Sequence, residues 1–124
     1  MATEIRELTI DDYDEIIRLW QDAGLEYKPE GRDRREMMAA EMARPFCVFL
    51  GLFENDRMIG LGIANWDGRR GWINRVAIDP DLRGKKLAGT IIKACEDFLY
   101  EQGAVVICAL IHEVNAPSMA CFEN

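Results

Sequence analysis

The sequence has little that could bind a metal ion. Its 124 residues include one histidine, His112, and four cysteines that form no C-x-x-C pair. Zinc sites are built from Cys and His clusters at short, regular spacing, so we expect no metal site. Three of the cysteines lie in apolar runs, and we expect the cysteines to pack as small hydrophobic side chains; the four are Cys47, Cys95, Cys108 and Cys121.

The sequence also lacks long apolar runs and an excess of basic residues. No run is long enough to span a bilayer and the N-terminus does not resemble a signal peptide, so the expected location is the cytoplasm. The formal net charge of -7 argues against a general nucleic-acid binder, because phosphate contacts need a basic face. With 49% hydrophobic and 30% charged residues, the composition is that of a globular protein, and residues 1–124 suffice for one domain.

Apolar spacing and turn residues predict a mixed sheet with helices on both faces. The order of elements is β-α-α-β-β-β-α-β-α, an α/β fold built on an α+β mixed sheet. Strands joined by tight turns must be antiparallel, whereas a strand reached through a helical crossover runs parallel to the strand before it. We expect strands at residues 4–8, 47–53, 58–66, 72–78 and 104–111, and helices at residues 9–24, 32–43, 87–102 and from 115 to 124.

Capping residues mark the ends of the first and third predicted helices. Thr9 begins a stretch that is similar to a capping box, with acidic residues in the first turn. Gly24 and Gly103 can each adopt the positive φ that closes a last turn. In the second helix three methionines are expected to face the core, an adaptable binding surface being the alternative; they are Met37, Met38 and Met42.

Residues 76–89 are the stretch on which the functional interpretation depends. Their pattern predicts a buried strand, a basic loop with glycines, and the start of a helix. A glycine-bearing loop at a helix start presents unpaired backbone N–H groups and the positive end of the helix dipole. Such a loop is suited to phosphate, and Arg83, Lys85 and Lys86 add positive charge to it. The alternative is a surface connection whose basic residues are solvated.

This stretch resembles the signature of the GCN5-related N-acetyltransferases, the GNAT superfamily. That signature is a strand followed by Arg/Gln-x-x-Gly-x-Gly/Ala at a helix start. Arg83 and Ala88 match it, whereas Lys86 stands where the family has glycine. A lysine there must hold a backbone conformation that glycine allows, but it brings a cation to the same phosphates. A second family motif, an Asn followed by a small residue and an aromatic, is similar to Asn115, Ser118 and Phe122.

The resemblance, together with the order of elements, covers roughly residues 2–124. It implies an N-acetyltransferase in which an amine attacks the thioester of acetyl-CoA directly, with the pyrophosphate on the backbone N–H groups of residues 83–88. In the family, the strand matching residues 72–78 diverges from the strand matching residues 104–111, which frees main-chain groups for pantetheine and for the thioester carbonyl. The implied acetyl-CoA-binding residues are Val76, Ala77, Ile78, Arg83, Gly84, Lys85, Lys86, Leu87, Ala88, Gly89 and Asn115.

The resemblance says less about catalytic side chains. Many family members use a tyrosine as acid where this sequence has Phe122, and one branch uses a glutamate as base where it has Leu110. Glu113 lies close by and is the candidate base, a solvated loop carboxylate being the alternative. The acceptor pocket is expected near Tyr27, by analogy with the family. A catalytically weak or inactive acyl-CoA-binding or sensor module is therefore the second functional hypothesis.

The family usually continues with two more strands after the second motif. Without them, the apolar strand at residues 104–111 would keep one open edge, which folded proteins avoid because an open edge pairs with other chains. We therefore expect either a fragment of a longer protein, or a homodimer or strand-exchanged dimer in which a second copy covers this edge.

Overall fold

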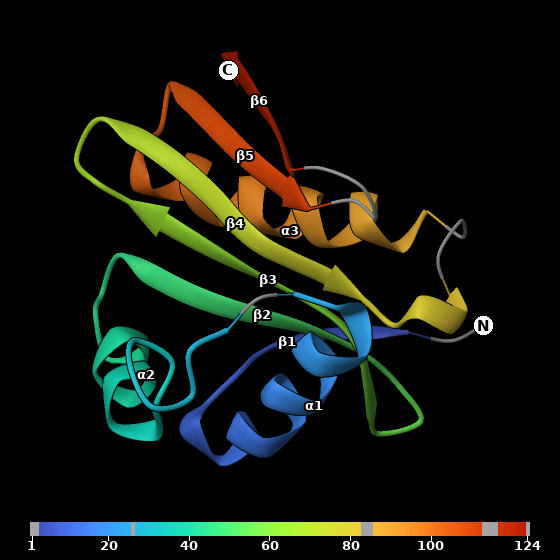
Figure 1. The fold of residues 1–124 in the computed structure, drawn as a ribbon. Helices are drawn as coiled ribbons and strands as arrows, with labels where there is room; N and C mark the ends of the chain where they lie inside the picture. Colours follow the sequence, from blue (N-terminus) through green and yellow to red (C-terminus); the bar gives the residue numbers. More distant parts are fainter. Residues whose placement is uncertain (1–2, 26, 83–85, 113–116, 124) are drawn as a thin grey trace.

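The structure is a computed structural model that describes residues 3–25, 27–82, 86–112 and 117–123, with side chains as far as Cys108. Within these residues the chain forms a six-stranded sheet in the order β1-β2-β3-β4-β5-β6, flanked by three helices (Figure 1). The strands are β1 (Glu4–Glu7), β2 (Cys47–Glu54), β3 (Arg57–Trp66), β4 (Arg70–Ile78), β5 (Val106–His112) and β6 (Pro117–Glu123). The helices are α1 (Tyr13–Ala23), α2 (Arg35–Met42) and α3 (Leu87–Gln102), with 3-10 turns at Ile10–Asp12 and Pro80–Leu82.

The mixed α/β fold that the sequence predicts is confirmed. Each of the neighbouring pairs β1–β2, β2–β3 and β3–β4 is antiparallel. Tight turns join β2 to β3 and β3 to β4, whereas α1 and α2 lie between β1 and β2 in the chain. The crossover through α3 makes β5 parallel to β4. β1 and β6 form the two edges of the sheet. None of the helices in the described part of the chain is long and apolar enough to cross a membrane.

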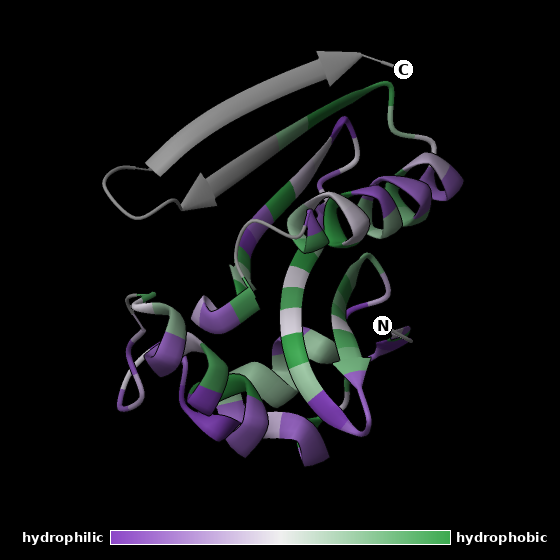
Figure 2. Cartoon of the chain, turned by 90° about the vertical axis from the view of Figure 1, so that its right-hand side faces the viewer, coloured by the Kyte–Doolittle hydropathy of each residue, from purple (hydrophilic) through white to green (hydrophobic). Residues whose placement is uncertain are grey.

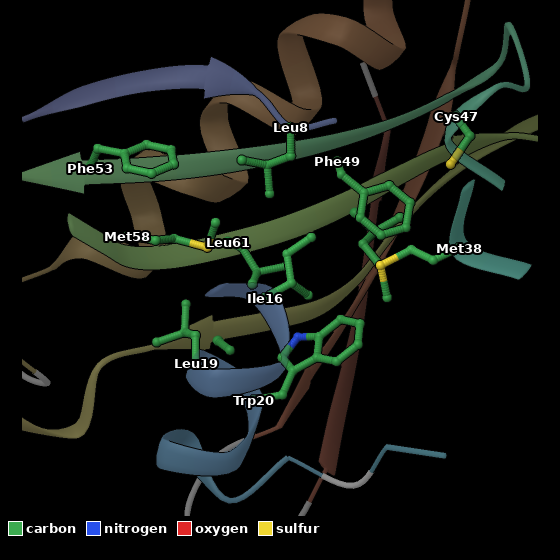
Figure 3. Close-up of a cluster of buried hydrophobic side chains, with 12 residues drawn as sticks. Leu8, Ile16, Leu19, Trp20, Met38, Cys47, Phe49, Phe53, Met58 and Leu61 are labelled. Carbon is green, nitrogen blue, oxygen red and sulfur yellow. The ribbon is translucent and has the colours of Figure 1, made fainter. Parts of the chain in front are cut away.

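The sheet separates two hydrophobic clusters. On one face α1 and α2 cover the sheet, and Trp20 packs there with Phe49 from β2 (Figure 3). On the other face α3 inserts Ile91 among strand residues that include Val48, the neighbour of Phe49 in sequence. Adjacent residues of one strand thus serve opposite clusters, as the pleat requires. In Figure 2 the strand β3 is largely green and white, whereas purple gathers on the helices and at the turns.

Local capping sets the helix ends where the sequence predicts them. Thr9 and Asp12 form a capping box, in which the Asp12 carboxylate accepts the Thr9 N–H at 2.9 Å. α1 ends at Gly24 with φ 74° and α3 ends at Gly103 with φ 105°, both left-handed conformations that favour glycine. These ends are encoded by single residues, so the sequence is sufficient to find them.

Glycines on β3 let α3 lie close against the sheet. A Cβ built on Gly62 would come within 2.7 Å of Ile91 Cγ2, and one on Gly60 within 2.6 Å of Ile91 Cδ1. Both distances are shorter than van der Waals contact, so a larger residue at either position would force the Ile91 side chain or the helix to shift. The contact of Ile91 with these two glycines therefore sets the position of α3 relative to β3 and to β4, the next strand in the sheet.

The last described element differs from the prediction. Residues 117–123 form β6, antiparallel to β5, where the sequence analysis expects a helix. A strand here covers the edge of β5 that would otherwise stay open, and this pairing outweighs a local preference for helix. Pro117 is the first residue of β6, a position where its missing N–H is tolerated. The outer edge on this side of the sheet is therefore β6 instead of β5.

Two expectations about sulfur-containing residues need correction. Met38 is buried, but Met37 is 44% exposed, because neighbouring positions on the short helix α2 point about 100° apart and cannot both face the core. Cys47 and Cys95 are buried free thiols, and burial raises the pKa of each to about 12. Cys108 is buried but disulfide-bonded; its neighbour across the β5–β6 pair is Cys121.

Candidate functional site

The end of β4 and the start of α3 carry the predicted cofactor residues that the structure describes. Val76, Ala77 and Ile78 close β4, and residues 86–89 open α3. Five of the predicted site residues lie outside the described residues; these are Arg83, Gly84, Lys85, Glu113 and Asn115. The described part of the site consists of the end of β4 and the start of α3.

Asp79 fixes the point where β4 ends. It is buried, and its N–H donates to the carbonyl of Ile59 on β3 at 2.8 Å. Its carboxylate accepts the Asp81 N–H at 3.0 Å, and its carbonyl accepts the Leu82 N–H at 2.9 Å. These bonds turn the chain through the 3-10 turn Pro80–Leu82, so the strand ends at Asp79-Pro80 as the sequence predicts.

A β-bulge at Arg75 interrupts β4 on both sides. Between Leu61 and Ile63 β3 advances by two residues while β4 advances by three, and the same mismatch separates β4 from β5. Arg75 has φ 54°, a left-handed conformation that lets the extra residue leave the ladder. The bulge shifts the alternation by one position, so that Ile73 and Val76 both face α3.

Past Val76, the end of β4 has a described strand partner on one side only. Among the described residues, pairing between β4 and β5 ends at Val76 opposite Ile111, while Ala77 and Ile78 pair with β3 alone. Because the Asp79 N–H points to β3, alternation turns the N–H and C=O of Ile78 to the opposite side. This is the arrangement that the resemblance predicts for contact with an extended amide chain.

α3 begins with features suited to an anion. The N–H groups of its first turn have no acceptor within the helix, and the side chain of Lys86 at the N-cap position does not cap them. Its first turn holds no acidic residue, whereas the first turn of α1 holds Asp14 and Glu15. A Cβ on Gly89 would meet nothing within 4 Å, so space lies open above this turn. A helix start with these features, at the positive end of the helix dipole, is chemically suited to a phosphate group.

Lys86 adopts the conformation that the family's glycine would allow. It precedes α3 with φ 62° and ψ 23° and its side chain is exposed. A non-glycine residue in this region costs about 1 kcal/mol. Lys86 therefore has the backbone conformation that glycine would favour at this position, and its side chain adds an ammonium group at the start of α3.

The loop between α1 and α2 lies beside this site but is less clearly a pocket. Tyr27 packs partly against the cluster under α1, and its hydroxyl is hydrogen-bonded to the Gln21 side chain. A shallow hollow of about 400 Å³ runs along the same loop, lined by Lys28, Pro29, Glu30, Gly31 and Arg32. Tyr27 is not part of that lining, so its predicted role in acceptor binding remains a prediction.

Sequence reasoning missed one pair at the site, Arg75 with Asp33. The two side chains form an ion pair with two hydrogen bonds, one of them Arg75 Nη2 to Asp33 Oδ2 at 2.7 Å. The sequence does contain a sign of the bulge that places Arg75. The apolar residues Ile73 and Val76 are three positions apart, whereas residues on one face of a regular strand are an even number of positions apart. In the described residues no group of His, Cys, Asp or Glu side chains could hold a metal ion.

Comparison with known sequences agrees with this geometry. The model of the acetyltransferase (GNAT) family matches residues 4–124. An acetyltransferase of Pectobacterium atrosepticum is 27% identical over 121 residues, which cover 98% of this chain and 84% of the relative. An acetyltransferase of Yersinia pestis is similar to the same extent.

Solved structures share the fold at lower identity. The PaiA N-acetyltransferase of Thermoplasma acidophilum, in complex with coenzyme A, superposes with a TM-score of 0.79 at 20% identity, over 94% of this chain and 83% of that chain. The ribosomal-protein-S18-alanine N-acetyltransferase of Escherichia coli gives a TM-score of 0.73 at 17% identity, over 93% and 70%. At these identities the likeness shows the fold alone.

The left-handed conformation at the start of α3 can be tested through stability. Lys86→Gly should unfold with a free energy about 1 kcal/mol higher than Lys86→Ala, because both remove the same cation and glycine alone relieves the left-handed strain. Urea denaturation of the two variants measures the difference.

The matched control is the same pair of substitutions at Lys93, an exposed position inside α3. There the order should reverse by about 1 kcal/mol, since glycine is a poor residue in a helix interior. If alanine were the more stable choice at both positions, Lys86 would not hold a left-handed conformation.

Proposed function

Since the chain belongs to the acetyltransferase (GNAT) family, we propose that it moves an acetyl group from acetyl-CoA to an amine of a small molecule, peptide or protein. The observation that carries this proposal is the juxtaposition of Ile78 main-chain groups, which have no strand partner among the described residues, with the acid-free start of α3. The end of β4 suits an amide chain and a carbonyl oxygen, and the start of α3 suits phosphate. An acyl-CoA carries both.

The donor site in this proposal consists mainly of backbone. The N–H groups of residues 86–89 would hold the pyrophosphate, with charge added by Lys86 and by Arg83 and Lys85. Ile78 would pair through its main chain with a pantetheine amide, Val76 would lie beside the same arm at the last pair with β5, and Asn115 would approach the arm. A β4 N–H near the bulge would stabilise the negative charge that develops on the thioester oxygen.

The reaction requires a neutral amine and a leaving thiolate. The amine nitrogen forms a bond to the carbonyl carbon of the acetyl group, and the C–S bond breaks. A proton of the amine passes to a base, directly or through water, and Glu113 is the proposed base. The CoA sulfur leaves as a thiolate and takes a proton from solvent. Because a thiol of moderate pKa is a good leaving group, Phe122 in place of a tyrosine is compatible with turnover.

Acetyl-CoA affinity should depend on the charge at the start of α3. Lys86→Glu should weaken acetyl-CoA binding by about tenfold or more, because it replaces a cation beside the phosphates with an anion. Calorimetric titration of acetyl-CoA into the wild type, expected to show micromolar binding, and into the variant measures this. Arg83→Ala should also weaken binding, because it removes a second cation.

Lys93→Glu is the matched control, because it makes the same charge reversal on an exposed position further along α3, beside Asp97. It should leave the affinity within about twofold, since an exposed charge beyond a Debye length is screened. Equal affinities for the wild type and both Lys variants would contradict the placement of the phosphates.

Turnover separates the enzyme from an acyl-CoA-binding module. The wild type is incubated with acetyl-CoA and a panel of primary amines: polyamines, aminoglycosides, amino acids and peptides with free N-termini. Thiol release above the rate of hydrolysis without amine supports the acetyltransferase. Tight acetyl-CoA binding with no amine-dependent thiol release would favour the module instead.

A second copy of the chain is also part of the proposal. β6 is the outer strand of the sheet order, and the main-chain groups of an outer strand can pair with another chain. A homodimer paired along β6 is the expected species. A monodisperse monomer in sedimentation velocity at micromolar concentration would contradict it.

A further inference from the structure

Arg75 is an unusual residue for the position it holds. It stands in the middle of β4, between residues of the two hydrophobic clusters, and has a left-handed backbone conformation. Bulges with a residue in this conformation usually place glycine there, because a Cβ strains the backbone. The side chain of Arg75 should therefore contribute something that glycine cannot.

That side chain reaches across to the loop between α1 and α2. Its guanidinium donates two hydrogen bonds to Asp33, one to each carboxylate oxygen, in the paired geometry typical of arginine with a carboxylate. The same guanidinium lies 4.2 Å from the centre of the Trp20 ring on α1. Three segments that are distant in sequence therefore meet at one cation.

Asp33 in turn holds its own loop together. Its side chain is 4% exposed, its carboxylate accepts the Lys28 N–H at 2.6 Å, and its N–H donates to the Lys28 carbonyl at 2.9 Å. Its carbonyl accepts the Tyr13 hydroxyl at 2.7 Å, which ties the loop to α1. Burial would raise the pKa of Asp33, yet the bonds from Arg75 and Lys28 hold that pKa below its usual value. The carboxylate is therefore charged and its position is fully determined.

We propose that Arg75 is a positioning residue that fixes the loop 28–33 against the bulged end of β4, where the acetyl group would be presented. The inference rests on the proposed function, because it makes this loop one wall of the acceptor site. It assigns two separable roles to one residue. The backbone of Arg75 shapes the donor site, and its side chain places the acceptor loop.

Arg75→Gly separates the two roles, because glycine keeps the left-handed conformation and removes the side chain. Hydrogen exchange of the Lys28 and Asp33 amides should become about tenfold faster or more, since charge-assisted bonds that hold the loop are lost. Acetyl-CoA affinity should stay within about twofold, because the bulge remains. With the amine of the panel that gives the fastest thiol release, kcat/KM for the amine should fall while KM for acetyl-CoA stays unchanged.

Further variants test whether the contact with Asp33 is responsible. Asp33→Asn should reproduce the exchange and kinetic changes, and the double variant should add nothing further, as expected for partners in one interaction. Arg75→Lys keeps the charge but loses the paired geometry, so its amide exchange and kcat/KM should lie between those of the wild type and Arg75→Gly.

Arg6→Ala is the matched control. Arg6 also forms a two-bond ion pair, with Asp12, and also lies 4.2 Å from an aromatic ring, that of Phe53, but it belongs to β1 at the far edge of the sheet. It should leave exchange of the Lys28 and Asp33 amides unchanged. Equal acceleration in both variants would reduce the effect to general destabilisation and overturn the proposal.

The two proposals fail in different ways. Unchanged amide exchange in Arg75→Gly, with acetyl-CoA bound normally, would overturn the positioning role and leave the proposed function standing. Absence of acetyl-CoA binding by the wild type would overturn the proposed function, while the exchange measurement would still report on the loop. A parallel loss of acetyl-CoA affinity and amine turnover in Arg75→Gly would show that the side chain supports the donor site, and would overturn the separation of roles.

Discussion

An extra residue in β4 sets the geometry around the candidate site. Because Arg75 holds a left-handed conformation, the side-chain alternation shifts by one position, and Ile73 and Val76 both face α3. Ala77 then faces α1, and the main-chain groups of Ile78 turn away from β3. Without this extra residue the alternation would continue unbroken, and Ile73 and Val76 would face opposite sides of the sheet.

The rest of the site depends on how closely α3 approaches this strand. Gly60 and Gly62 on β3 admit Ile91, which fixes the helix beside the end of β4. Asp79 stops the strand and turns the chain toward the helix start. A site made of backbone N–H groups and a helix dipole depends on chain conformation more than on particular side chains. Lys86 illustrates this, because it replaces the family's glycine and keeps the left-handed conformation.

The sequence predicts those features that are encoded locally. Thr9, Gly24 and Gly103 act within one helical turn, and the hairpins follow from turn residues between apolar runs, so these boundaries agree with the structure. β6 was missed because its stability comes from pairing with β5, which local propensity does not report. The Arg75–Asp33 contact joins residues 42 positions apart, and neither residue alone indicates its partner.

In the proposed function, the backbone at the end of β4 and at the start of α3 binds one acyl-CoA molecule. Amide NMR spectra recorded during titration with acetyl-CoA test it most directly, because each N–H reports its own hydrogen bond. We expect saturable shifts of the Ile78 and Lys86–Gly89 amides with one common dissociation constant, and little change in β1 and β2. Saturable binding that leaves the Ile78 amide unshifted would contradict this binding mode.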